Sequence, residues 1–136
     1  MKKQINSGSS FENDFAYSRA VVQDQWVFVS GTTGYDYKNM CISESVVEQT
    51  EQCFKNIQNA LLEAGCDLND VVRIRYILPN KKDFQACATT IQRYLANSRP
   101  AATMFEAGLI DKAMKIEIEV TALKQNHWQY WAKKMA

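Results

Sequence analysis

The alternation of apolar and polar positions along the chain predicts several strands and helices. Residues 20–22 and 26–29 are apolar segments with a polar turn between them, which is typical of two strands in a hairpin. Gly31 and Gly34 are expected to end the second strand, because glycine adopts backbone angles that are closed to other residues. The first fifteen or so residues are mostly polar, so we expect a lead-in with little structure.

Two segments have the apolar spacing of helices. From Val47 to Ala64 apolar residues recur on one helical face, and Gly65 supplies a stop. Ser45 and Glu48 fit a capping box, in which the serine caps the helix and the glutamate reaches back to it. A second helix is predicted over about residues 83–96, with one apolar face.

Three further segments read as strands, and together with the helices they indicate a fold class. Residues 71–78 are rich in β-branched side chains, residues 101–107 follow the second helix, and residues 115–123 alternate strictly between apolar and polar. The order is strand, strand, helix, strand, helix, strand, strand, which indicates an α+β fold. Two helices cover one face of such a sheet, so the other face is expected to be buried by oligomerisation.

Composition narrows the class of protein. The chain has 136 residues, one domain's length, and a net charge of +1 with both signs interspersed, which argues against nucleic acid as a partner. No apolar segment is long enough to span a membrane and no signal peptide is apparent, so we expect a cytoplasmic protein. The four cysteines form no Cys-x-x-Cys pair and the sole histidine is His127, so no metal site is expected.

Three motifs in a fixed order carry a family resemblance. They are Val-Ser-Gly-Thr-Thr-Gly at residues 29–34, Arg-Pro-Ala-Ala-Thr-Met at residues 99–104 and Lys-Ile-Glu-Ile-Glu at residues 115–119. The chain thereby resembles the RidA/YjgF family of enamine and imine deaminases, formerly called endoribonuclease L-PSP. The resemblance implies a RidA/chorismate-mutase-like fold at residues 1–124, with a mixed sheet of about six strands and two helices on one face, and an extension at residues 125–136.

The resemblance also implies a homotrimer whose inter-subunit clefts bind a small-molecule ligand without metal or cofactor. In the family an arginine grips the substrate carboxylate, and here Ala102 occupies that position, as in a branch without the arginine. By the same resemblance Glu117 orients the attacking water, while Tyr17 and the Ser30–Gly31 backbone contact the ligand. Met104 replaces a small residue of the site.

Arg75 is the first candidate to replace the missing arginine. It interrupts a β-rich strand, and a buried guanidinium needs a partner. Three interpretations stay open: Arg75 pairs with Glu117 or Glu119 across the sheet, binds ligand, or faces solvent. Arg99 has the same ambiguity between a ligand role and a salt bridge at the surface or interface.

Two functions of different classes follow. In the first, the trimer hydrolyses an imine, enamine or related compound, with little activity on simple 2-imino acids because Ala102 cannot bind their carboxylate. In the second, a non-catalytic trimer binds a small molecule or docks a partner, with the aromatic residues of 125–136 as a candidate contact. Ribonuclease activity is a third, disfavoured by the charge balance.

Overall fold

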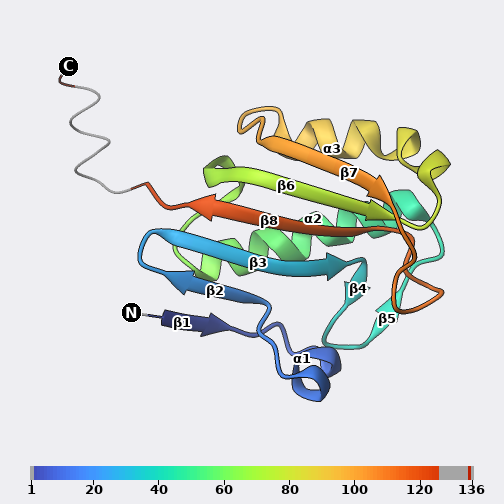
Figure 1. The fold of residues 1–136 in the computed structure, drawn as a ribbon, viewed down its shortest axis with the longest axis horizontal. Coiled ribbons are helices and arrows are strands. Elements are labelled where there is room, and N and C mark those ends of the chain that lie inside the picture. The colour runs from blue at the N-terminus through green and yellow to red at the C-terminus, as the bar shows by residue number, and fades with distance from the viewer. Residues whose placement is uncertain (1, 126–134, 136) are drawn as a thin grey trace.

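A computed structural model describes residues 2–125 and residue 135. Within this part of the chain, six strands form one sheet in the order β1-β2-β3-β8-β6-β7 (Figure 1). β6 and β7 are parallel and the other neighbours are antiparallel, so the predicted mixed sheet is confirmed. The strands are β1 (Lys2–Ile5), β2 (Ala20–Gln23), β3 (Trp26–Thr33), β6 (Val71–Leu78), β7 (Ala101–Glu106) and β8 (Glu117–Leu123).

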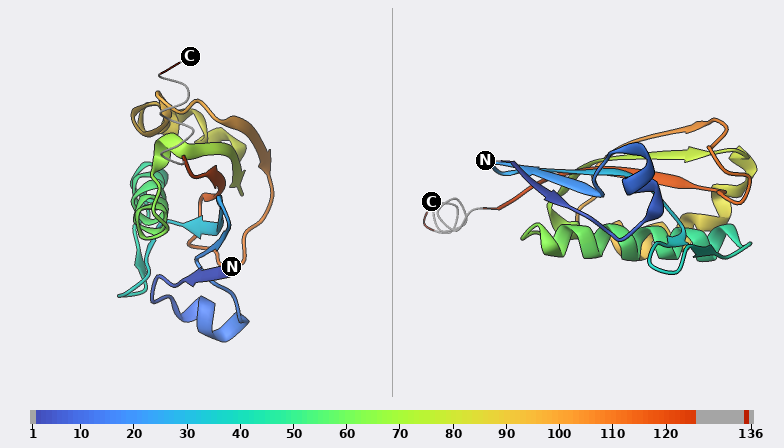
Figure 2. Two further views of the ribbon diagram at one scale, coloured as in Figure 1. Left: turned by 90° about the vertical axis from the view of Figure 1, so that its left-hand side faces the viewer. Right: turned by 90° about the horizontal axis from the view of Figure 1, so that it is seen from below.

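Helices α2 (Val46–Glu63) and α3 (Ala88–Leu95) lie on one face of this sheet, as predicted (Figure 2). Short elements complete the described part of the chain. They are α1 (Ser10–Phe15), the hairpin of β4 (Tyr35–Asp36) and β5 (Cys41–Ile42), and the 3-10 turns η1 (Leu68–Asp70), η2 (Lys81–Asp83) and η3 (Gln85–Cys87). None of the described helices combines the length and apolar composition needed to cross a bilayer.

The core lies between the sheet and α2, where the period-2 pattern of strands meets the period-3.6 pattern of the helix. On β8, Ile118, Val120 and Ala122 are buried against the helices, and the residues between them face the other side of the sheet. The apolar face of α2 packs on them, and its fully buried members are Cys53, Phe54, Ile57 and Leu61.

The cap at the start of α2 includes one residue more than the predicted capping box, namely Ser43. Ser45 caps the helix as expected, since its hydroxyl accepts a bond from the Glu48 backbone N–H at 3.2 Å. The Glu48 carboxylate, however, accepts from the Ser43 hydroxyl rather than from the Ser45 backbone, which donates to Ser43 instead. Ser43 thus bridges the two halves of the box. The predicted stop is confirmed, with Gly65 at a φ of 88°.

The N-terminal lead-in is ordered, contrary to the prediction. β1 pairs with the edge of β2 through its backbone, which needs no apolar alternation in the sequence. α1 begins with Ser9 as its cap and is held by the contact of Phe11 with Tyr35 and by the ion pair of Glu12 with Arg19. The partners of β1 and Phe11 are distant in sequence, so a local pattern does not reveal them.

Two element boundaries also differ from the prediction. The segment expected to be one helix over residues 83–96 begins as the 3-10 turns η2 and η3, and only residues 88–95 are α-helical. β3 continues past Gly31 through a β-bulge and ends at Thr33, directly before Gly34, the second of the two predicted glycines. Three steps along β3, from Val29 to Thr32, match two along β8.

The face of the sheet opposite the helices presents large apolar side chains on β3. Trp26 and Phe28 are 43% and 47% exposed, and their rings stack on each other with centroids 6.5 Å apart. Exposed aromatic neighbours on an uncovered sheet are typical of a surface that another protein chain covers. The predicted contact of the 125–136 extension falls mostly outside the described residues.

Candidate functional site

A pocket of about 240 Å³ opens where β3, β8, α1 and the loop before β8 converge. Its walls are mainly aromatic or apolar, with backbone at Gly31 and a carboxyl group at Glu117. We call it the Glu117 pocket, and its lining residues are Phe11, Phe15, Tyr17, Gly31, Thr33, Tyr37, Ile110, Met114 and Glu117. Three residues that the sequence placed in one site, Tyr17, Gly31 and Glu117, therefore lie together.

Glu117 is half-buried and fixed at the first position of β8, between Thr33 of β3 and Ile77 of β6. Its carboxyl group lies directly over the Gly31 backbone. A Cβ atom added to Gly31 would be 2.8 Å from the Glu117 Cδ and Oε2 atoms, so any larger residue at this position displaces the carboxyl group. The bulge and the glycine together make room for the acid in the pocket.

The surroundings of Glu117 favour its protonated form. Burial raises the pKa of its carboxyl group, and the negative charge of Glu119 on the same strand raises it further, while the Arg19 cation opposes both. A carboxyl group with a raised pKa accepts and returns protons closer to neutral pH than a free glutamate. The pocket therefore holds a group suited to general acid and base chemistry.

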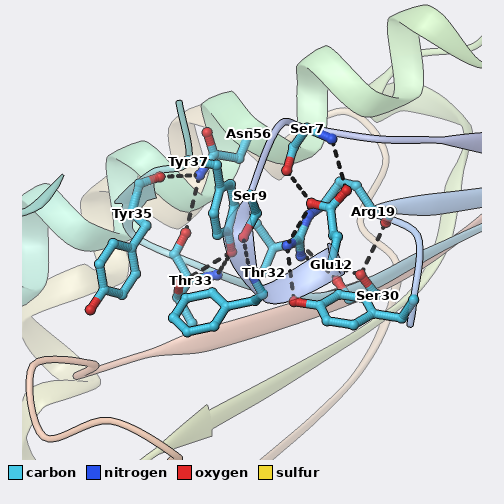
Figure 3. A network of polar contacts seen from close by, with 12 residues as sticks. Ser7, Ser9, Glu12, Arg19, Ser30, Thr32, Thr33, Tyr35, Tyr37 and Asn56 are labelled. Carbon is cyan, nitrogen blue, oxygen red and sulfur yellow. Dashed lines mark hydrogen bonds and ion pairs between the residues drawn. The ribbon is translucent and has the colours of Figure 1, made fainter. Parts of the chain in front are cut away.

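A buried arginine, Arg19, is at the centre of a polar network next to the pocket-lining residues Gly31 and Tyr37, and Figure 3 shows its contacts with Glu12 and Ser30. It is 1% exposed and forms an ion pair with Glu12 of α1 at 3.3 Å. Its guanidinium donates to the Gly31 carbonyl oxygen at 2.7 Å and to the Ser30 hydroxyl at 3.2 Å, and it lies 4.2 Å from the ring centroid of Tyr37. Arg19 thus ties α1 to the bulge of β3.

Arg19 and Glu12 are not among the site residues predicted from the sequence. The available signals were weak: Ser9-x-x-Glu12 has the spacing of a helix start, and Arg19 is a charged residue next to the apolar strand at residues 20–22. The Glu12 carboxylate does not close a capping box but accepts from the Ser7 backbone at 3.0 Å and from the Ser7 hydroxyl. Nothing in the local pattern distinguishes that arrangement from an ordinary cap.

The floor of the pocket is a small apolar cluster separate from the main core. Tyr35, Tyr37 and Met114 are buried together, and Phe11 of α1 packs edge-on against Tyr35 with ring centroids 5.6 Å apart. The Asn56 amide of α2 donates to the Thr33 and Tyr35 carbonyl oxygens at 3.1 and 2.8 Å (Figure 3). This cluster connects the pocket to α2.

Two other predicted residues line a different hollow. Ser30 and Arg75 belong to a cavity of about 300 Å³ on the uncovered face of the sheet, together with Glu119. Arg75 pairs with Glu119 across the β6–β8 ladder, with Nη1 and Oε1 3.0 Å apart. Of the three interpretations of Arg75, the structure shows pairing across the sheet, with Glu119 rather than Glu117 as the partner, and the Arg75 side chain is also exposed to solvent in the single chain.

Ala102 and Met104 are separated from Glu117 within one chain. They pair with Ile74 and Tyr76 of β6, whose side chains are buried on the helix side of the sheet. Ala102 and Met104 line a hollow of about 370 Å³ there, together with Arg99 from the segment between α3 and β7. The residues carried over by resemblance therefore fall into three hollows of the single chain rather than one.

No three metal-ligating side chains gather in the part of the chain that the structure describes. The predicted core cysteines, Cys53 and Cys87, are fully buried free thiols, and burial raises the pKa of both. Raised thiol pKa values leave little thiolate at neutral pH, so neither cysteine has the character of a nucleophile.

The chain matches a known protein family over most of its length. A sequence model of the endoribonuclease L-PSP family matches residues 8–124. Among curated proteins, the human 2-iminobutanoate/2-iminopropanoate deaminase is 31% identical over 109 residues, which cover 79% of this chain and 80% of that protein. The rat protein of the same name is 32% identical over 125 residues, 91% of each chain.

Solved structures give the same picture of the fold. A member of the YjgF/YER057c/UK114 family from Mycobacterium tuberculosis superposes with a TM-score of 0.82 at 31% identity, over 90% of this chain and 99% of that one. RidA from an Antarctic Psychrobacter bacterium has a TM-score of 0.74 at 32% identity, over 79% and 87% of the two chains.

Proposed function

Because this chain belongs to the endoribonuclease L-PSP family, which is also called the RidA/YjgF family, we propose that it hydrolyses an imine or enamine in the Glu117 pocket. The observation that carries the proposal is the half-buried Glu117 carboxyl group, held over the Gly31 backbone and beside Tyr17. Relatives of this chain are named 2-iminobutanoate/2-iminopropanoate deaminases, and hydrolysis of a C=N bond is the reaction those names describe.

The proposed reaction adds water across the C=N bond and yields a carbonyl compound and ammonia. Glu117 takes a proton from the attacking water and returns it to the departing nitrogen, a role that its raised pKa supports. An enamine is first protonated on carbon to give the imine, and the same carboxyl group is placed to supply that proton. The chain's own residues account for these steps.

We further propose that the protein acts as a homotrimer with the site completed between subunits. The exposed Trp26 and Phe28 on the uncovered sheet face support an interface there. In such an assembly β7 of a neighbouring subunit lies beside the Glu117 pocket, which brings Ala102 and Met104 to the ligand although they are distant from Glu117 in their own chain. A cytoplasmic location remains an expectation from the sequence.

Ala102 limits the proposed activity on simple 2-imino acids. The methyl side chain of Ala102 cannot donate the two parallel hydrogen bonds that an arginine donates to a carboxylate. A hydrogen bond to a charged group contributes about 1.5–3 kcal/mol, so the loss of the pair weakens binding of the acid by roughly a hundredfold or more.

The test compares four proteins: wild type, Ala102→Arg, Glu117→Gln and the double variant. The 2-imino acids are generated in situ by an amino-acid oxidase, and light scattering gives the mass of each protein. We expect low activity for wild type, a gain for Ala102→Arg, and loss of that gain when Glu117→Gln is added. Efficient wild-type hydrolysis that survives Glu117→Gln would contradict the proposed role of the acid.

Ala102 also supports a second candidate, a trimer that binds a small molecule without chemistry, since it removes a group that the relatives' named substrates need. This candidate predicts that Ala102→Arg binds imino acids without hydrolysing them. RNA cleavage is not proposed, because the charged wall of the pocket is a carboxyl group and would repel phosphate.

A further inference from the structure

The walls of the Glu117 pocket indicate the class of ligand that enters it. Among the described residues that line it, Glu117 supplies the one carboxyl group and no lysine or arginine is present. The remaining walls are four aromatic rings and two apolar side chains, with backbone and a buried threonine between them. Such a pocket attracts cations through the acid and through the negative faces of the rings.

The nearby arginines are not available to bind a ligand anion. Arg19 lies behind the Tyr17 and Tyr37 rings, is 1% exposed, and its guanidinium is already bonded to Glu12 and to the Gly31 carbonyl. Its charge is balanced by Glu12 at 3.3 Å. Arg75 is paired with Glu119 and lines another hollow. Arg99 lines the separate hollow of Ala102 and Met104. Within one chain, a carboxylate in the Glu117 pocket would therefore meet Glu117 without a counterion.

We infer that the Glu117 pocket takes a non-acid substrate with a cationic nitrogen at Glu117 and an apolar or aromatic remainder, that is, the protonated imine of a hydrophobic amine. This inference rests on the proposed function, because it assigns a substrate class to the same pocket. A protonated imine is also the form whose carbon water attacks most readily, so one carboxylate both attracts the cation and orients the water.

The size of the pocket fits such a remainder. An apolar cavity of about 150 Å³ accommodates benzene, and the Glu117 pocket has a volume of about 240 Å³. A benzyl or phenethyl group therefore fits between the rings. Tyr17 and Phe15 are 37% and 71% exposed, so they form the part of the walls that faces solvent.

Binding of three stable probes of similar shape to the full-length protein tests this inference. The probes are benzylamine, benzyl alcohol and benzoate, and isothermal titration calorimetry at pH 7 and low salt measures their affinities. We expect benzylamine to bind at least tenfold more tightly than either of the others. Glu117→Gln is expected to remove that preference while leaving benzyl alcohol binding unchanged. Glu63→Gln, the same substitution on α2, serves as the matched control and is expected to keep the preference.

The outcomes separate the inference from the function on which it rests. Equal affinity for the three probes, tighter binding of benzoate, or no binding of benzylamine overturns the inference, whatever the activity on imino acids. A second measurement follows ammonia release from imines that a flavin amine oxidase generates from benzylamine. Preferential benzylamine binding without any such hydrolysis, in wild type and Ala102→Arg alike, overturns the proposed catalysis and leaves the assigned ligand class standing.

Discussion

At the scale of single residues, the structure depends on a buried ion pair. Arg19 and Glu12 are 1% and 5% exposed, and they join α1 to the carbonyl of Gly31 at the pocket. A buried pair of this kind adds little net stability by itself, because both ions lose their hydration. Removing one partner is costly, since the other is left buried without a counterion.

We therefore predict that Glu12→Gln destabilises the protein by about 3–5 kcal/mol, because Arg19 loses its counterion. Urea denaturation followed by circular dichroism measures the change. The control is Glu63→Gln, the same substitution on α2, which is expected to change the free energy of unfolding by less than about 0.5 kcal/mol. A loss below about 1 kcal/mol for Glu12→Gln would mean that the hydrogen bonds of Arg19 suffice to hold its charge.

At the scale of elements, the turn after β3 is packed against α2 with no space for a side chain. A Cβ atom added to Gly34 would lie 2.5 Å from the Gln49 Cα, which is backbone and cannot swing away. Gln49 itself is fully buried and bonds through its amide to the Ala113 carbonyl at 2.8 Å and the Lys115 N–H at 2.9 Å. The turn, the helix and the loop before β8 therefore form one unit.

Gly34→Ala is expected to destabilise the protein by about 1–3 kcal/mol, the usual result of overpacking a tight contact. Gly108→Ala is the control, because a Cβ there meets nothing within 4 Å. Thermal denaturation measures the stability of both variants. A Gly34→Ala protein as stable as the control would show that α2 can move away from the turn.

A helix or strand can be predicted when its own residues carry the sequence pattern that specifies it. α2, β6 and β8 were predicted correctly because their own periodicity, caps and β-branched residues specify them. β1 and α1 escape prediction because the edge of β2 and Tyr35, on which they pack, are remote in sequence, and because the Glu12–Arg19 pair leaves no periodic pattern. The bulge in β3 was missed for the same reason, since a register shift is a property of two strands.

The residues of the candidate site likewise divide into those that could be predicted and those that could not. Tyr17, Gly31 and Glu117 came from a family resemblance and lie together in the pocket, but Phe11, Tyr37 and Arg19 were not foreseen. Phe11 belongs to α1, which the sequence pattern did not predict, whereas Arg19 lies in the bend before β2 and Tyr37 in the turn after β4. Resemblance transfers single positions, whereas the walls and the charge behind them arise from packing.

At the scale of the whole molecule, one face of the sheet is covered by helices and the other carries exposed aromatic rings. We predict that Phe28→Glu converts the proposed trimer to monomers, because three charges would be buried at once between subunits. Light scattering measures the mass. Leu62→Glu, a substitution of an exposed apolar residue on α2, is the control and is expected to leave the mass unchanged. A trimer that persists in Phe28→Glu would place the interface elsewhere.

The bulge at Ser30 and Gly31 divides β3 into two stretches with different roles. The stretch before it, with Trp26 and Phe28, supplies the exposed surface, and the stretch after it, with Thr33, lines the pocket. The extra residue absorbs the change in register between the two stretches. In the proposed trimer the first stretch faces a neighbouring subunit and the second faces the ligand, so one strand connects the subunit contact to the ligand site. A substitution that changes how subunits pack on the first stretch is therefore expected to alter the pocket on the second.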